Sequence, residues 1–244
     1  MHAAPQDCIQ VQHVQAGRWP ALDDVSLGQA HHWPHLQRGR TTALLLDWRA
    51  SPDGTGRIDR MTRDQQRLAA RRVLRQVLAA HLKVALDAIV MARQPGLAPQ
   101  WHVRSTENVT GAAMGPVGVS LSHEEGISLI ALRPEAELGV DLFDLFNPSR
   151  VQAWPDTLDV ATLYLGPEAT RRCADAAGLG DTQLARQFGV EWTRHEAAIK
   201  CLGHALREWH PALAAQAESC VIQSLALPEP WLGAAAWRNP SNPP

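Results

Sequence analysis

Residues 117–132 limit the possible folds more than any other stretch of the chain. Residues 117–122 (VGVSLS) alternate apolar and small side chains, and residues 127–132 (ISLIAL) alternate again. The segment between them, His-Glu-Glu-Gly at 123–126, has the composition of a turn. Two alternating runs joined by a short, glycine-containing turn are typical of a β-hairpin. The pattern therefore predicts a pair of antiparallel strands.

Longer stretches have helical spacing instead. Thr62 followed by Gln65 matches a capping box, and apolar residues recur at helical spacing from there to about Leu82. Further helices are expected at 167–177, from 181 to about 206, and, in a shorter form, within 145–166. Further strands are expected at 41–48, 88–92, 138–144, 219–226 and 231–237. Helices mixed with antiparallel strands predict an α+β fold.

The order of these elements also suggests how the chain is divided. A chain of 244 residues is long for one ordinary domain and short for two. Both halves show the order strand, helix, then strands, which predicts two similar α+β halves at 1–137 and 138–244. Residues 1–40 are expected to be loop with at most one strand, 94–99 a turn, and 102–115 irregular.

Composition excludes several classes of function. The formal net charge is −2, whereas proteins that bind mainly nucleic acid or anionic membranes carry a basic excess. No apolar run reaches the roughly 18 residues of a membrane-spanning helix. The N-terminus also lacks the pattern of a signal peptide. We therefore expect a cytoplasmic protein that has neither nucleic acid nor a membrane as its partner.

The four cysteines give no sign of a disulfide framework or a zinc site. They lie far apart, with no C-x-x-C pair, at Cys8, Cys173, Cys201 and Cys220. Reduced thiols are the simplest interpretation. Cys201 directly follows Lys200, so it is either a nucleophilic thiol or, the favoured alternative, a small filler of the core.

The stretch 192–200 (WTRHEAAIK) places charges on an unusual face of a predicted helix. At about 100° per residue, Glu196 and Lys200 share one stripe with Trp192 and Ile199. Two interpretations follow. Glu196 and Lys200 form either a surface ion pair worth roughly 0.2–0.5 kcal/mol or part of a functional site.

Two other residues invite a functional interpretation. His123 stands at the end of a predicted strand, close to Ser120 and Ser122. It either binds an anion there or forms hydrogen bonds within the turn. Asp141 interrupts a predicted strand between Val140 and Leu142. Because a carboxylate inside a strand is unfavourable without a partner, it either marks the strand end or binds a partner such as a metal ion.

Three motifs, taken together, resemble a known family. They are S-L-S-H at 120–123, G-V-D at 139–141, and W-x-x-x-E-A-x-x-K at 192–200. Their order and spacing are similar to those of the 4′-phosphopantetheinyl transferases of the larger, surfactin-synthetase-activating type. The resemblance extends, more weakly, from about Arg67 to Trp237. It implies two similar α+β halves related by a pseudo-two-fold axis, with the active site in the cleft between them.

The resemblance also implies a reaction and its partners. The phosphopantetheine arm of coenzyme A would be transferred to a serine of an apo acyl or peptidyl carrier protein, and 3′,5′-adenosine bisphosphate would leave. Magnesium is the implied cofactor. It typically binds through one or two carboxylates together with substrate phosphates. The family further suggests a monomer.

Residue by residue, the resemblance implies three catalytic positions. Asp141 matches the family's metal-binding aspartate. Glu196 matches the glutamate that binds the metal and assists deprotonation of the serine. Lys200 matches the lysine that faces the pyrophosphate.

Coenzyme A would be bound by a second, overlapping set of residues. His123, with Ser122 beside it, matches the histidine placed on a phosphate of coenzyme A. Arg75 stands near the family's arginine at the adenosine 3′-phosphate, although a row of arginines on that helix could equally cover the edge of the core. His195 occupies a position where the family usually has lysine. A histidine supplies positive charge there only when it is protonated.

The chain departs from the family pattern at two further places. The turn at 96–99 lacks the basic residue that the family often has there. Phe143 replaces the second acid of the G-V-D-x-E motif, and Asp144 could take its place only through a local bulge of the strand. The sequence therefore indicates a divergent transferase. The alternatives are a non-catalytic relative that binds coenzyme A or a carrier protein, and a metal-dependent phosphoester hydrolase.

Overall fold

The computed structural model describes residues 9–15, 34–49, 62–92, 100–104, 117–147 and 156–239. The chain divides into two units, 1–136 and 137–244. The boundary expected from the sequence lies one residue later, between 137 and 138. Both units combine helices with mainly antiparallel strands, in agreement with the predicted α+β class.

A four-stranded sheet forms the centre of the first unit. Its strands are β1 (Gln10–Gln15), β2 (Thr42–Asp47), β6 (Ile127–Pro134) and β5 (Val117–Glu124), in that spatial order. β5 and β6 pair antiparallel, and they are joined at Gly126, whose φ of 75° suits glycine. The predicted hairpin is confirmed, with each strand two residues longer than the pattern indicated.

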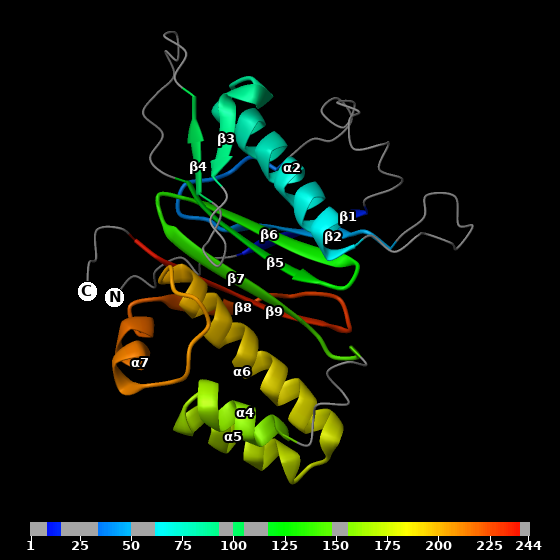
Figure 1. Ribbon diagram of the computed structural model, residues 1–244, viewed down its shortest axis with the longest axis vertical. Coiled ribbons are helices and arrows are strands. Elements are labelled where there is room, and N and C mark those ends of the chain that lie inside the picture. Colours follow the sequence, from blue (N-terminus) through cyan, green and yellow to red (C-terminus); the bar gives the residue numbers. More distant parts are fainter. Residues whose placement is uncertain are drawn as a thin grey trace, which may run out of the picture. The chain divides into compact units, whose positions relative to one another are not determined.

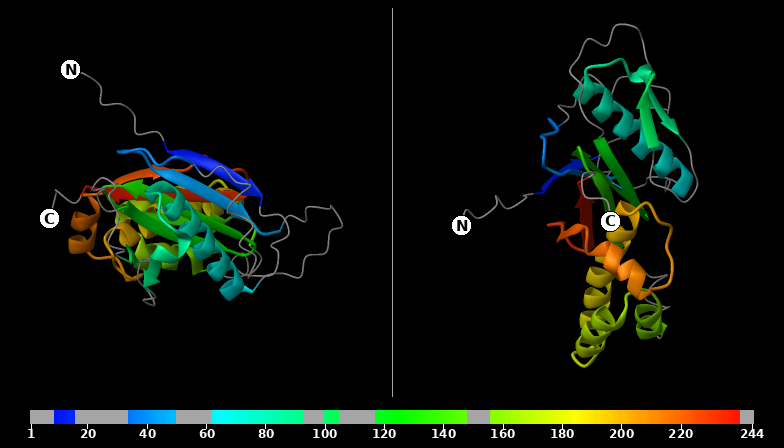
Figure 2. Two further views of the ribbon diagram at one scale, coloured as in Figure 1. Left: turned by 90° about the horizontal axis from the view of Figure 1, so that it is seen from above. Right: turned by 90° about the vertical axis from the view of Figure 1, so that its left-hand side faces the viewer.

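Helix α2 (Arg63–Leu82) packs against one face of this sheet (Figures 1 and 2). Its start is the predicted capping box: the Gln65 amide donates to Thr62 Oγ1, and the Thr62 amide donates to Gln65 Oε1. The helix and the sheet share a core of apolar residues, among them Leu44, Leu46, Val73, Leu74, Val77, Leu78, Ile130 and Leu132. The apolar spacing that predicted the helix is therefore its buried face.

A short hairpin follows α2. It consists of a 3-10 turn, η1 (Leu86–Ala88), and strands β3 (Ile89–Ala92) and β4 (Gln100–Val103). β3 agrees with the strand predicted at 88–92. The expectation of irregular structure from residue 102 was wrong for residues 102–103, because a four-residue strand is too short to show alternation. The turn predicted at 94–99 lies outside the described residues.

The second unit is built on a three-stranded antiparallel sheet. Its order is β7 (Glu137–Asp144), β9 (Trp231–Arg238) and β8 (Val221–Ser224). All three strands were predicted, and β8 is shorter than the expected 219–226. β7 and β9 pair one to one along their whole length, from Glu137 opposite Arg238 to Asp144 opposite Trp231.

In the described part of this unit, four helices accompany the sheet. They are α4 (Thr157–Tyr164), α5 (Pro167–Ala177), α6 (Asp181–Cys201) and α7 (Pro211–Ala217). The long helix α6 packs along β7 and β9, and α5 packs against α6 (Figure 1). Within the described residues, none of the helices combines the length and apolar character needed to cross a membrane.

One expectation for this unit was wrong, and one helix was missed. The helix predicted to reach about Leu206 ends at Cys201, where Gly203 (φ 72°) terminates it in a left-handed conformation. Helix α7 was not predicted, although its signal was present: Pro211 occupies the first turn, and the His210 ring accepts a hydrogen bond from the Leu213 amide.

Candidate functional site

Gly139 brings β7 into direct backbone contact with α6. A Cβ atom at this position would overlap the Ala197 carbonyl oxygen and the Cys201 amide nitrogen. Only a residue without a side chain allows this approach. Because side chains alternate along a strand, Asp141, two residues further along, is presented to the same helix.

The approach of β7 to α6 joins Asp141, Glu196 and Lys200 in one cluster. Lys200 Nζ lies 2.6 Å from Asp141 Oδ1 and 3.8 Å from Glu196 Oε2, and it donates to the Val140 carbonyl at 3.1 Å. The side chains are largely shielded from solvent, with exposed fractions of 9% for Asp141, 13% for Glu196 and 27% for Lys200. Lys200 is thus bound more closely to Asp141 than to Glu196. A simple surface pair between Glu196 and Lys200 does not describe this arrangement.

Phe143 belongs to the hydrophobic core of the second unit. It is buried, its ring meets Phe188 edge-on at 6.1 Å, and it contacts the helix opposite Gly189. The pairing of β7 with β9 is unbroken through Asp144, so the strand has no bulge there. Asp144 Oδ1 instead accepts a hydrogen bond from the Phe146 amide in the following turn. Asp144 therefore does not take the place of the family's second acid.

The chemistry of Asp141 and Glu196 fits a magnesium ion. Among the described residues, no group of three or more His, Cys, Asp and Glu side chains is arranged to hold a metal. The two carboxylates nevertheless converge on one cation, the Lys200 ammonium. Magnesium takes oxygen ligands and commonly uses only one or two protein carboxylates beside water and phosphate. Asp141 and Glu196 are the residues that would hold it.

In the first unit, His123 is held by a buried chain of hydrogen bonds. Its Nδ1 lies 2.8 Å from Ser128 Oγ, on the paired position of β6, and the Trp48 indole donates to the same oxygen at 2.8 Å. Ser128 is fully buried. Ser122 lies on the other face of β5 because neighbouring residues of a strand alternate. The ring of His123 is thus oriented through Nδ1, and any contact with a phosphate has to come from Nε2.

Arg75 lies well along α2 from the turn that follows His123. The side-chain amide of Gln66 is 3.4 Å from the Glu124 carbonyl, and Arg75 is nine residues further along the helix, about 14 Å at 1.5 Å per residue. The Arg75 guanidinium donates to the Leu86 carbonyl at 3.0 Å. Its Nε is buried without a partner among the described residues. Arg75 and His123 would therefore contact different parts of a ligand.

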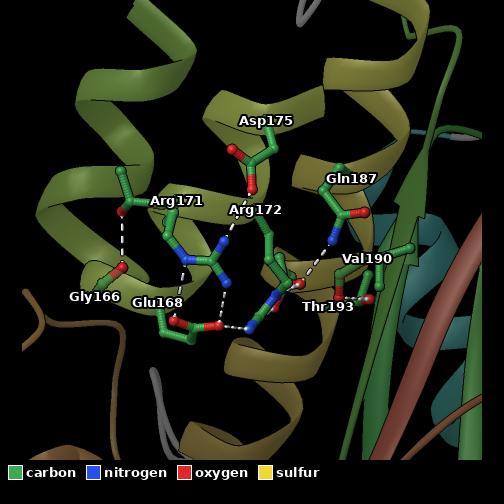
Figure 3. A network of polar contacts seen from close by, with 10 residues as sticks. Gly166, Glu168, Arg171, Arg172, Asp175, Gln187, Val190 and Thr193 are labelled. Atoms are coloured by element: carbon green, nitrogen blue, oxygen red, sulfur yellow. Dashed lines mark hydrogen bonds and ion pairs between the residues drawn. The ribbon is translucent and has the colours of Figure 1, made fainter. Parts of the chain in front are cut away.

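Helices α5 and α6 are joined by a polar network (Figure 3). Arg172 binds the buried Glu191 carboxylate with both prongs of its guanidinium, at 2.6 and 2.8 Å. Gln187 donates to the same carboxylate at 2.7 Å, and Glu168 accepts from Arg172 at 3.1 Å. Bidentate, charge-assisted bonds of this kind fix orientation. They hold α5 against α6 beside a cavity.

This cavity, of about 450 Å³, receives His195. Helices α5, α6 and α7 contribute to its lining, together with Trp209, Cys220 and Ile222. Among the described residues, neither Glu196 nor Lys200 lines it. A coenzyme A contact from His195 would therefore have to be made through the cavity, on a different side of α6 from the Lys200 cluster.

Burial lowers the pKa of His195 below its ordinary value of 6.5, and its Nε2 is buried without a partner among the described residues. The His195 ring is therefore harder to protonate in the folded chain than in the unfolded chain. The resulting stability is complete above pH 6.5 and is lost as the pH falls through the folded pKa.

We expect His195→Gln to make folding less sensitive to acid. Between about pH 7 and pH 5, the free energy of unfolding in urea should fall more steeply for the wild type than for the variant. His102→Gln, on an exposed position of β4, is the control and should keep the wild-type slope. Equal slopes for all three proteins would contradict the assignment of a buried, neutral His195.

Comparison with known proteins gives no family assignment. No family model and no curated protein matches the chain. A function therefore has to be inferred from its own residues and their contacts.

Sequence reasoning missed two supporting residues. The role of Gly139 depends on tertiary contact. Its sequence signals, a glycine inside a predicted strand and its place in the G-V-D motif, did not indicate this contact. Ser128 had a clearer signal, because it is a hydroxyl residue in the otherwise apolar run 127–132. A polar side chain in a buried strand needs a hydrogen-bond partner, and His123 on the facing strand supplies one.

Proposed function

We propose that the protein transfers the 4′-phosphopantetheine group of coenzyme A to a serine of an apo acyl or peptidyl carrier protein, releasing 3′,5′-adenosine bisphosphate. The observation that supports this most is the shielded cluster in which Asp141 and Glu196 converge on Lys200. Its residues belong to two of the three family motifs. The proposal includes a pseudo-two-fold relation of the halves, an active site between them, a monomer and a cytoplasmic location.

The proposed reaction needs one proton acceptor and several positive charges. The carrier serine oxygen attacks the phosphorus that bears the pantetheine arm, and the bond from that phosphorus to the bridging oxygen breaks. Glu196 accepts the serine proton at a carboxylate oxygen. Lys200 neutralises charge on the pyrophosphate, and Asp141 positions Lys200 through the 2.6 Å ion pair.

Magnesium, held by Asp141 and Glu196, would add positive charge beside the pyrophosphate. Phe143 cannot contribute a ligand, so this chain has fewer protein carboxylates at the site than the family pattern implies. Shielding of the cluster from solvent strengthens each of these electrostatic interactions.

The test is direct. The protein is incubated with coenzyme A, magnesium and a panel of apo carrier proteins, and the carriers are analysed by intact mass. We expect the mass of phosphopantetheine to be added to a carrier serine. Failure to modify any carrier, including one encoded beside this protein, would count against the proposal. Release of free phosphopantetheine without an acceptor would indicate a hydrolase instead.

One observation favours a second candidate function. The buried Phe143 replaces a metal-binding acid of the family, as expected if the chain were a non-catalytic relative that binds coenzyme A or a carrier protein as a scaffold. Calorimetry separates the two. Metal-dependent binding of coenzyme A supports the transferase, and metal-independent binding of a carrier without turnover supports the scaffold.

The hydrogen bonds at His123 lead to a further prediction. Ser128→Ala removes the oxygen that orients the ring, so kcat/KM for coenzyme A should fall by about tenfold, mainly through KM. Trp48→Phe is the matched control. It removes a hydrogen bond from the same oxygen but leaves the contact between Ser128 and His123 in place.

Steady-state kinetics and thermal unfolding distinguish positioning from stability. Both variants should lose stability. Trp48→Phe leaves Ser128 with one partner fewer, whereas Ser128→Ala leaves both the Trp48 indole and the His123 ring with one partner fewer and should cost more. Only Ser128→Ala should change KM. A parallel change in KM for both variants would show that the effect comes from general destabilisation.

A further inference from the structure

Two cysteines of the second unit lie against each other. Cys201 is the last residue of α6 and is buried, and Cys220 immediately precedes β8. Cys220 packs on the small apolar cluster that contains Cys201 and Ala236. The two thiols also hydrogen-bond to each other. They are 19 residues apart in sequence, and the fold alone brings them together.

The two sulfur atoms have different surroundings. Cys220 is half-buried and lines the cavity of about 450 Å³, so small molecules in the cavity can approach it. Cys201 is buried, and its Sγ lies 3.5 Å from the Glu137 carbonyl oxygen, so its single S–H is shared between that oxygen and the Cys220 sulfur. Arg238, which is ion-paired with Glu137, lies close enough to act electrostatically on both thiols.

These surroundings give the two cysteines different roles. Cys220 is suited to be the nucleophile, and Cys201 to be the resolving cysteine that completes the disulfide. The hydrogen bond with Cys201, together with Ser219 and the charge of Arg238, lowers the pKa of Cys220, against the opposing effects of burial and Glu137. The hydrogen bond to Cys220 and burial raise the pKa of Cys201. Cys220 lines the cavity whereas Cys201 is buried, so Cys220 is the sulfur that a small molecule in the cavity meets. Its lowered pKa favours the thiolate, which is the reactive form of cysteine.

We propose that Cys220 and Cys201 form a peroxide-oxidisable dithiol pair that closes reversibly to a disulfide. The Cys220 thiolate attacks one oxygen of hydrogen peroxide, the O–O bond breaks, and the departing hydroxide takes up a proton to become water. Cys220 is then a sulfenic acid. The Cys201 sulfur loses its proton and attacks the Cys220 sulfur, and the S–O bond breaks to release the second water.

The overall step is balanced. Two thiols lose two protons and two electrons, and one peroxide takes them up to become two water molecules. A small dithiol reverses the change by thiol–disulfide exchange. The pair does not depend on the proposed transfer reaction, although Cys201 is the residue next to Lys200.

Cys173 provides an internal comparison. It is fully buried between α5 and α6, and burial together with the charge of Glu191 raises its pKa to about 11. Peroxide therefore cannot reach the Cys173 sulfur, and the thiol stays protonated near neutral pH. Peroxide should leave it reduced.

The test uses the full chain, reduced and then freed of reductant. It is treated with a small excess of hydrogen peroxide at neutral pH, and remaining thiols are blocked with N-ethylmaleimide. Intact mass should show a loss of the two thiol hydrogens and two fewer blocked thiols. Peptide mapping should find Cys201 linked to Cys220, and dithiothreitol should restore both thiols.

Four variants make the assignment specific. Cys173→Ser and Cys8→Ser should form the same disulfide as the wild type. Cys220→Ser should form none. Cys201→Ser should stop at the sulfenic acid of Cys220, which dimedone traps as a covalent adduct at that residue. Retention of all thiols by the wild type, a disulfide through Cys173 or Cys8, or no dimedone adduct in Cys201→Ser would overturn the proposal.

Discussion

Gly139→Ala is expected to prevent the second unit from folding. The added methyl group would overlap the Ala197 carbonyl and the Cys201 amide, which are backbone atoms that cannot turn aside as a flexible side chain can. β7 cannot retreat, because Gly139 is paired with Ala236 of β9. Relief would require the separation of α6 from the sheet. We expect a loss of more than about 4 kcal/mol in the free energy of unfolding, or no soluble protein.

Gly178→Ala is the matched control for this prediction. Gly178 ends α5 with φ −62° and ψ −16°, an ordinary helical conformation, and a methyl group there would meet only the Asp175 carbonyl at 3.4 Å. This substitution should leave stability unchanged or raise it by up to about 1 kcal/mol. Urea unfolding followed by circular dichroism measures both variants. Wild-type stability for Gly139→Ala would show that β7 and α6 are not in the contact described.

The fold was predictable where a pattern was long enough to repeat. The hairpin at 117–132 and the capping box at Thr62 both appear in the structure, because alternation and capping are local signals. Elements of four to seven residues give little periodicity, so their prediction was uneven: β3 and β8 were found, whereas β4 and α7 were missed. The end of α6 was misplaced although Gly203 marked it.

The site was only partly predictable, for a different reason. A helical wheel places Glu196 and Lys200 on one stripe, but it does not show which strand lies opposite. The close contact between Lys200 and Asp141 depends on Gly139, whose effect appears only when helix and strand are packed. His195 is adjacent to Glu196 in sequence, yet the 100° step of the helix directs it into a separate cavity.

Phe143 shows why family patterns and packing have to be considered together. By alternation it faces α6, as Gly139 and Asp141 do, so an acid at this position would point toward the same helix. In this chain the ring meets Phe188 and fills the space opposite Gly189. The environment of position 143 in this chain is apolar. Introducing glutamate would therefore bury a charge among aromatic rings.

Glu196→Gln is expected to reduce kcat of the proposed transfer by about 10²–10⁴-fold, the usual contribution of a general base. Glutamine has nearly the same shape as glutamate, and Lys200 keeps its closer partners, Asp141 and the Val140 carbonyl. The fold should therefore remain intact. The measurement is the initial rate of carrier modification, followed by mass spectrometry, with circular dichroism to check folding. Glu208→Gln, at an exposed position after α6, should keep the wild-type rate.

Asp141→Asn separates the two carboxylates by function. Asp141 is the closer partner of Lys200, so its neutral amide would leave the ammonium with one carboxylate, at 3.8 Å, and would weaken its positioning. On the proposed roles, Glu196→Gln lowers kcat because a proton acceptor is lost, whereas Asp141→Asn also raises the magnesium concentration needed for activity. If Glu196→Gln retained the wild-type rate, Glu196 would not be the base. If only Asp141→Asn lost activity, the proton acceptor would have to be a residue outside α6, the helix that carries Glu196.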